Sequence, residues 1–292
     1  MTAFLTVLQA VAPVGLLAAL GYGWERSGRD WPVAFVTRLA MGVATPCLVF
    51  TALVRAEVAP EALGAVALAA LIGYAALLAT FALLTRLLGL ATRVYAVPLA
   101  FGNTGNLGLP LALFAFGETG LSLAVAVFAV GMVLQFSLGA WLMADGGGLR
   151  VLREPAIWAA LLGGLFLWQG WSLPRWLGDT VALAGQMAIP LMLLTLGVAV
   201  ARLRPEQLPL SAGLSLVRLG LCLAVGITVA FLLAPDRLAF AVIVLQLSTP
   251  VPVTAYLMAE RLGGDGSAAA GLVLASTLLA LISLPVTLAF LI

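Results

Sequence analysis

Lysine and histidine are absent from this 292-residue chain, and all 14 of its basic residues are arginine. Without histidine there is no histidine metal ligand and no histidine proton relay. The net charge of +2 gives no sign of a nucleic-acid partner. Charged residues make up 9% of the sequence, against about 25% in soluble domains. With 63% hydrophobic residues and a mean hydropathy of +1.18, the chain is predicted to be an all-α polytopic protein of the lipid bilayer.

Cysteine is scarce as well, with two residues at positions 47 and 222. Cys47 and Cys222 lie in apolar segments far apart in the sequence, so we expect small buried side chains rather than a disulfide or a metal site. No Asp or Glu lies deep in a predicted span, and no carboxylate proton relay is visible. The sequence has no nucleophile–base pair, metal cluster or phosphate-binding loop, so we expect neither a cofactor nor an enzyme.

The apolar segments predict ten transmembrane helices joined by short connections. Their expected ranges are about 3–22, 33–54, 61–85, 93–116, 119–143, 155–171, 176–200, 208–233, 238–260 and 267–291. The polar stretch Asp145–Glu154 lies at the midpoint of the chain and is typical of a linker. We therefore expect a first five-helix repeat at 1–145, a cytoplasmic linker at 146–154 and a second repeat at 155–292.

The placement of arginine predicts how these helices lie in the membrane. The connections after the odd-numbered helices hold ten arginines, and the opposite side holds three. Because cytoplasmic connections carry the excess of positive charge, the odd connections are assigned to the cytoplasm. Both termini are then expected outside the cytoplasm. The all-arginine, alanine- and leucine-rich short chain is typical of a bacterial inner (plasma) membrane protein.

A weak internal repeat relates the two halves. Pro46 in the second helix and Pro190 in the seventh are offset by 144 residues, and the Pro-Glu pairs that begin at Pro60 and Pro205 are offset by 145. Each half has five predicted helices, an odd number. The second half therefore begins on the opposite side of the membrane, and the repeat is predicted to be inverted.

The stretch from Gly102 to Pro110, GNTGNLGLP, interrupts the apolar segment 94–116. In a helix, glycine costs about 1 kcal/mol and proline about 3 kcal/mol. In a membrane, a helix break is tolerated only where it is buried in protein or lines a watery cavity. A second break is expected at Ser248–Pro252, at the related place in the second half. Broken helices of this kind hold the substrate in transporters.

Polar residues around the two breaks are the candidate site. Half-helix N-termini favour an anion, and free carbonyl ends favour a cation. The candidate substrate-binding residues are Asn103, Thr104, Gly105, Asn106, Ser248, Thr249, Thr254, Gln135 and Arg218. The candidate crossover or hinge residues are Gly108, Pro110, Pro250, Pro252, Pro46 and Pro190.

Three alternatives stay open for these residues. The amides of two plainly kinked helices can satisfy one another without any substrate. Gln135 can serve only to join helices through a hydrogen bond. Arg218 can extend toward the cytoplasmic surface instead of attracting an anion.

At these residues the chain resembles the auxin efflux carrier family, which includes plant PIN proteins and bacterial carriers of malonate or malate. The run from Asn103 to Leu111, NTGNLGLPL, follows the family's pattern in its fourth helix. In the ninth helix Pro250 and the Ala255-Tyr256 pair match the family. Thr254 stands where bacterial members often have asparagine, and Pro252 is an additional proline.

The resemblance implies a ten-helix inverted repeat with crossed fourth and ninth helices, as in sodium/bile-acid symporters. Helices 3–5 and 8–10 would move against helices 1, 2, 6 and 7 in an elevator-like alternation of access. The function implied is secondary transport of a small organic anion, auxin-like or malonate- or malate-like. A sodium-coupled bile-acid-like symporter and a channel or sensor of the same fold are the alternatives. A coupling ion, proton or sodium, and a homodimer, as in plant members, are open as further partners.

Overall fold

The computed structural model describes residues 2–56, 58–143, 154–202, 208–255 and 266–292, and these residues form helices and turns without a strand. The helices of the first half are α1 (Thr2–Arg26), α2 (Val33–Leu39), α3 (Thr45–Val54), α4 (Pro60–Leu87), α5 (Thr92–Ala100), α6 (Leu109–Leu134) and α7 (Ala140–Met143). Three π-helical turns join some of them: η1 (Ala40–Ala44), η2 (Thr104–Gly108) and η3 (Gln135–Gly139). The second half has α8 (Pro155–Gln169), α9 (Arg175–Gln186), α10 (Ala188–Arg202), α11 (Leu208–Leu233), α12 (Arg237–Ser248) and α14 (Gly266–Leu291).

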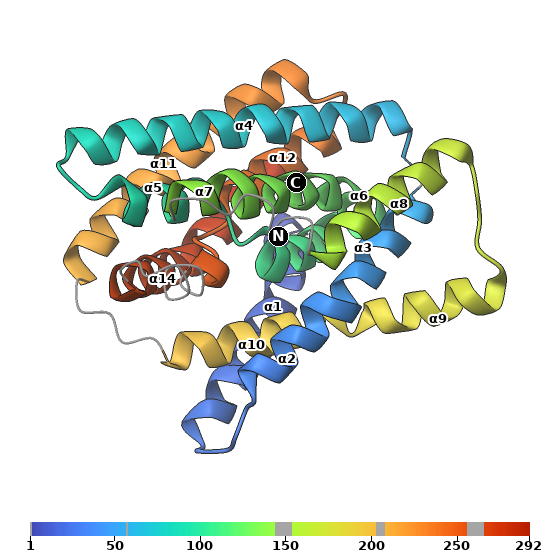
Figure 1. Ribbon diagram of the computed structural model, residues 1–292, viewed down its shortest axis with the longest axis horizontal. Helices are drawn as coiled ribbons and strands as arrows, with labels where there is room; N and C mark the ends of the chain where they lie inside the picture. Colours follow the sequence, from blue (N-terminus) through green and yellow to red (C-terminus); the bar gives the residue numbers. More distant parts are fainter. Residues whose placement is uncertain (1, 57, 144–153, 203–207, 256–265) are drawn as a thin grey trace.

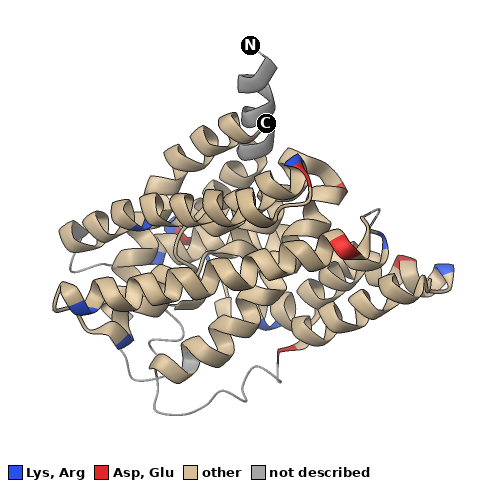
Figure 2. Ribbon diagram, turned by 90° about the horizontal axis from the view of Figure 1, so that it is seen from above, with Lys and Arg blue, Asp and Glu red and all other residues tan. Residues whose placement is uncertain are grey.

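The helices have the length and composition of a membrane protein. Within the described ranges, seven helical segments are long and apolar enough to cross a bilayer, and α8 is a shorter apolar helix. One segment, Thr92–Met143, has 52 residues, which at 1.5 Å per residue is about 78 Å, more than two bilayer widths. It reverses direction at Gly117, where φ is +68°. Figure 2 shows most of the charged residues near the ends of helices and long uncharged stretches between them.

Two groups of helices make up the molecule (Figure 1). In the first group, α1 packs against α10, and α3 packs against α8 and α9. In the second group, α4 packs against α5, α6 and α11, while α11 also contacts α12 and α14. Helix α6 joins the groups because it also contacts α1, α3 and α8. The group of α1–α3 and α8–α10 is called the outer group below, and the other is called the inner group.

Small residues let α1 and α10 approach within backbone contact. A Cβ atom added at Gly197 of α10 would overlap the carbonyl oxygen of Ala18, and one added at Gly21 of α1 would overlap that of Leu194. Close helix crossings of this type are characteristic of membrane proteins, where packing of small residues replaces the hydrophobic effect between helices. The outer group is therefore held together by a contact that leaves no room for larger side chains.

The predicted all-helical membrane fold is confirmed, and several predicted interruptions are present. The expected fourth and fifth helices meet at the reversal at Gly117. The predicted second helix consists of α2 and α3 with the π turn η1 between them, just before Pro46. The predicted seventh helix is divided at Met187, just before Pro190, into α9 and α10. Residues 144–153, which include most of the predicted linker, and residues 256–260 of the predicted ninth helix lie outside the described ranges. The ten-helix inverted repeat stays a prediction.

Candidate functional site

The two predicted helix breaks are present and touch each other. Residues 101–103 separate α5 from η2, and residues 249–252 follow the end of α12. The backbone N–H of Asn103 in the first break donates a hydrogen bond to the carbonyl oxygen of Pro250 in the second, at 2.7 Å. Segments almost 150 residues apart in the chain therefore meet at their non-helical backbone.

The helix that follows the first break begins before Pro110. It starts with η2 at Thr104, and Pro110 lies beyond this turn in the first turn of α6. Proline has no N–H and clashes with the carbonyl four residues before it, and a wider π turn accommodates this clash. Within η2 the N–H of Leu109 reaches the carbonyl of Thr104. Pro110 therefore shapes the first turns of the second half-helix, while Asn103 directly precedes them.

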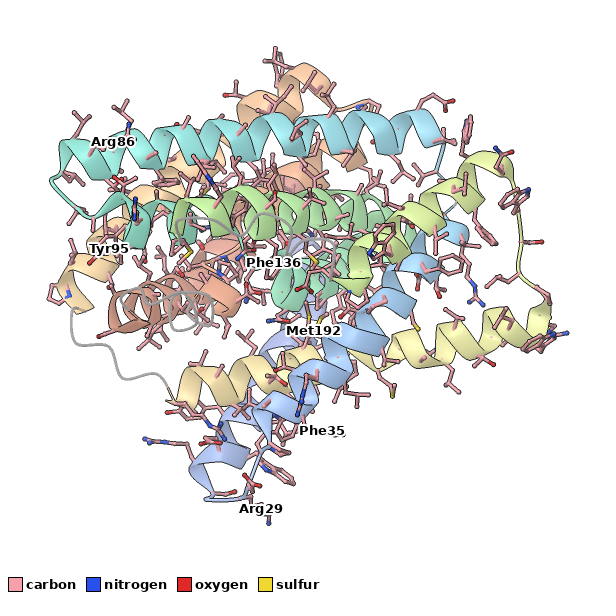
Figure 3. The ribbon with its side chains drawn as sticks, in the orientation of Figure 1. Arg29, Phe35, Arg86, Tyr95, Phe136 and Met192 are labelled. Carbon is pink, nitrogen blue, oxygen red and sulfur yellow. The ribbon has the colours of Figure 1, made fainter. Side chains whose placement is uncertain are left out.

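A cavity of about 550 Å³ lies between the outer and inner groups, next to the touching breaks. Residues Asn103, Thr104, Gly105 and Asn106 of the first break and of η2 line it. Further polar side chains come from facing helices and turns: Thr37, Gln135, Thr195, Arg202, Thr254 and Ser267. Its apolar lining comes from methionine and phenylalanine: Met41, Phe128, Met132, Phe136 and Met192. Figure 3 shows Phe136 and Met192 near the centre of the view, one from each group of helices. The cavity thus has both a polar and an apolar wall.

Asn103 lies at the buried polar wall of the cavity. Its side chain is 3% exposed, and its Nδ2 atom has no hydrogen-bond partner among the described residues. It also precedes η2, whose first backbone N–H groups lack acceptors within the helix. The cavity wall therefore presents an unpartnered amide donor beside a helix N-terminus.

A hydrogen bond between Gln135 and Thr254 joins two other segments of the cavity lining. The Nε2 atom of Gln135 donates to Oγ1 of Thr254 at 3.2 Å. The hydrogen bond expected of Gln135 as a residue that joins helices is present, and the same two side chains line the cavity, so both roles of Gln135 stay predictions. Gln135 begins η3, the π turn near the end of the fifth predicted helix.

Ser248 and Thr249 are buried near the second break but do not line the cavity. The hydroxyl of Ser248 donates to the carbonyl of Leu245, and that of Thr249 donates to the carbonyl of Gln246. Both side chains therefore satisfy the last turn of α12. Among the predicted hinge residues, Pro252 lines the cavity, while Gly108, Pro110, Pro250, Pro46 and Pro190 do not.

Arg218 of α11 also lies away from the cavity. It is 2% exposed and donates hydrogen bonds to three backbone carbonyls beside the breaks. The alternative in which Arg218 extends to the cytoplasmic surface is therefore wrong. Its predicted contact with the substrate stays a prediction.

Arg202, at the C-terminal end of α10, also lines the cavity, and in the sequence it is one of the ten arginines that predict the orientation in the membrane. Its Nε and Nη2 atoms each donate to the Glu25 carboxylate at 2.8 Å. These hydrogen bonds hold the pKa of Glu25 below its ordinary value. Of the described residues that line the cavity, Arg202 is the only one that carries a charge. Its position at the cavity follows from tertiary packing, for which the sequence has no local signal.

A cavity beside two touching helix breaks, in an apolar helical chain, is an arrangement typical of membrane transporters. Comparison with known proteins agrees. The family described as "Membrane transport protein" matches residues 6–150 and 148–288. The chain belongs to this auxin efflux carrier-like family. It is 32% identical to a protein of Methanothermobacter thermautotrophicus called an uncharacterized transporter, over 97% of this chain and 97% of that protein.

Proposed function

We propose that this protein is a secondary transporter of small organic carboxylates, which bind in the cavity beside the two breaks. The proposal rests chiefly on Asn103, which lines the cavity and whose buried Nδ2 atom has no hydrogen-bond partner among the described residues. Leaving a buried polar group without a partner costs about 1–3 kcal/mol. A ligand oxygen that accepts a hydrogen bond from Nδ2 would remove this cost, so the site is arranged for an acceptor.

The electrostatics of the cavity favour an anionic acceptor. A helix N-terminus carries about half a positive charge, and the start of η2 lies in the cavity wall. The described lining includes Arg202 and no acidic residue. A carboxylate bound at Asn103 would therefore meet positive potential from the half-helix and no opposing negative side chain.

The rest of the lining selects for a substrate with an apolar body. Three methionines and two phenylalanines are the large apolar side chains of the lining. A cavity of about 550 Å³ has the size of ordinary small-ligand sites. The lining has one half-helix N-terminus, and the charge of Arg202 is already paired with Glu25, so the site suits one carboxylate better than two. We therefore place aromatic or aliphatic monocarboxylates, such as indole-3-acetate, ahead of short dicarboxylates such as malonate.

Alternating access is proposed to arise from movement of the inner group against the outer group. The cavity lies between the groups and extends to Val33 and Thr37 of α2, Arg202 of α10 and Ser267 of α14. These residues adjoin the arginine-rich connections assigned to the cytoplasm. In this proposal the breaks are the crossed centre of an inverted repeat, and the cavity opens toward the cytoplasm.

The first experiment is a thermal-shift screen of the purified protein with mono- and dicarboxylates, because a ligand of the folded state raises the melting temperature. A monocarboxylate is expected to raise the melting temperature of the wild type in a dose-dependent way. In Asn103→Ala the affinity should fall tenfold or more, since hydrogen bonds to charged groups contribute about 1.5–3 kcal/mol. The unliganded melting temperature should change little, because Nδ2 has no partner to lose.

Ser122→Ala is the matched control for this variant. The hydroxyl of Ser122 is buried and donates to the carbonyl of Ala52, away from the cavity. This control should lower the unliganded melting temperature and leave the carboxylate shift intact. Counterflow of the identified carboxylate in proteoliposomes then tests transport. Equal carboxylate affinity in Asn103→Ala and wild type would contradict the proposed site, and conductance without counterflow would indicate a channel.

A further inference from the structure

Arg218 is a fully buried charge with an unusual set of partners. Its Nε atom donates to the carbonyl of Leu99 at 2.9 Å, and Nη2 donates to that of Phe101 at 2.9 Å. Its Nη1 atom donates to the carbonyl of Thr249 at 2.7 Å. Within the described part of the chain, no carboxylate forms an ion pair with it. A buried charge without an opposite charge is costly, so these carbonyls have to supply the compensation.

The three carbonyls belong to the ends of two helices. Leu99 lies in the last turn of α5 and Phe101 is its C-cap residue, while Thr249 is the C-cap residue of α12. The C-terminus of a helix carries about half a negative charge on its free carbonyl groups. Two such ends that converge on one point provide about one negative charge. One guanidinium, with its fixed positive charge and its fork of donors, balances this amount.

We propose that Arg218 is a built-in cation, which neutralises the carbonyl ends of both broken helices and holds α5, α12 and α11 together as one unit. In this role it occupies a position that would otherwise suit a small monovalent cation. Arg218 is thus a positioning residue, because it acts on the backbone of the breaks and not on the substrate. The opposite ends of the breaks keep their positive potential for an anion.

The proposal is tested by removing the guanidinium and returning it as a free molecule. Arg218→Ala removes the atoms of one ethylguanidinium ion from a closed site. In a choline chloride buffer without sodium, this variant is expected to melt several degrees below wild type. Ethylguanidinium at millimolar concentration should restore at least half of the loss in a saturable way. Ethylurea, which has a similar shape and no charge, should restore none.

Two further comparisons separate the charge from simple filling of space. Wild type should show no saturable response to ethylguanidinium, because Arg218 already fills the site. Replacing choline by sodium at equal ionic strength should raise the melting temperature of Arg218→Ala and leave wild type unchanged. An ethylguanidinium effect equal to that of ethylurea, or equal in wild type, would overturn the proposal.

Arg218→Lys and Arg218→Met extend the test to the case in which Arg218→Ala is not recovered from the membrane. These two side chains have similar length, and only lysine carries a charge. The lysine variant is expected to melt above the methionine variant, and the reverse order would contradict the role of charge. Wild-type stability that depends on sodium would contradict it as well.

All of these measurements use unliganded protein, so they are independent of the proposed carboxylate site. If ethylguanidinium rescues Arg218→Ala and the carboxylate affinity of Asn103→Ala is unchanged, the built-in cation is supported and the proposed anion site is rejected. The opposite combination, no rescue and lost affinity in Asn103→Ala, would retain the anion site alone.

Discussion

At the scale of single residues, Gln246 is the most tightly confined polar side chain beside the breaks. It is fully buried, and neither Nε2 nor Oε1 has a hydrogen-bond partner among the described residues. Its amide lies against Gly108 so closely that a Cβ atom at position 108 would overlap Oε1. Gly108 therefore makes room for this amide, which gives the predicted hinge glycine a packing role.

Gly108→Ala should lower the melting temperature because the added methyl group collides with Gln246. Overpacking of this kind costs about 1–3 kcal/mol. Shortening the partner in Gly108→Ala/Gln246→Ala should recover most of the loss, which makes the two substitutions non-additive. Thermal melts of the two single variants and the double variant in detergent measure the coupling.

Gly42→Ala is the control for this pair, since a Cβ atom at position 42 would meet nothing within 4 Å. It should be neutral or slightly stabilising. Additive losses at positions 108 and 246 would show that the two residues do not compete for the same space.

The sequence predicted the polar wall of the cavity better than its apolar wall. Polar residues at a break in an apolar helix have to face protein or water, so Asn103 and Thr254 were identifiable. Gln135 was identifiable as a lone amide within an apolar helix. The methionines and phenylalanines were not, because a helix that is apolar all round has no face distinguished by its sequence. Ser248 was predicted at the site and bonds its own helix instead, because a hydroxyl reaches the carbonyl of the preceding turn.

At the scale of helices, α1 and α10 of the outer group are in backbone contact at Gly21 and Gly197. Gly197→Ala should be strongly destabilising, because its Cβ atom would meet backbone atoms of Ala18 and Tyr22 that cannot rotate away. We expect a loss at or above the upper end of the 1–3 kcal/mol typical of overpacking. The measurement is the melting temperature together with the fraction of monodisperse protein on size exclusion.

Gly23→Ala on α1 is the matched control, since no atom lies within 4 Å of a Cβ at that position. Alanine favours a helix over glycine by about 1 kcal/mol, so this variant should be at least as stable as wild type. Similar melting temperatures for the variants at positions 197 and 23 would show that α1 and α10 are not in backbone contact in the membrane protein.

Glycine and proline allowed the sequence to predict where helices are interrupted, but not how. The breaks at 101–103 and 249–252 and the reversal at Gly117 fall within or beside predicted interruptions. The π turns η1, η2 and η3 were not predicted, because they add one residue to a turn without changing the apolar pattern. Because η2 precedes α6, the second half-helix begins at Thr104 and not at Pro110.

At the scale of the whole molecule, composition predicted a helical membrane protein and the helix 4 motif indicated the family. The grouping of helices into outer and inner groups followed from the family resemblance and not from the residues themselves. Short connections imply that helices consecutive in the sequence lie side by side. They do not predict that α1 packs against α10, which lies far from it in the sequence. The helix surfaces that make such contacts are apolar all round, so the sequence does not show which face meets which helix.

Arginine placement together with the cavity's position predicts the side of the membrane on which the cavity opens. We expect the connection after α1 in the cytoplasm and that between α8 and α9 outside. In spheroplasts carrying a Cys47→Ser chain, a membrane-impermeant maleimide should label Ser172→Cys and should label Ser27→Cys only after lysis. Both positions are exposed, and Cys222 is buried, so the remaining native thiol should contribute little labelling.

Thr37→Cys reports the open end of the cavity in the same experiment, because Thr37 lines the cavity near α2's first turn. If the cavity opens inward, Thr37→Cys should react with the maleimide only after lysis, as Ser27→Cys does. A bound monocarboxylate should then slow the reaction of Thr37→Cys and leave that of Ser27→Cys unchanged. Labelling of Ser27→Cys in sealed spheroplasts would reverse the orientation. Labelling of Thr37→Cys with Ser27→Cys still protected would keep the orientation and show that the cavity opens outward in the cell.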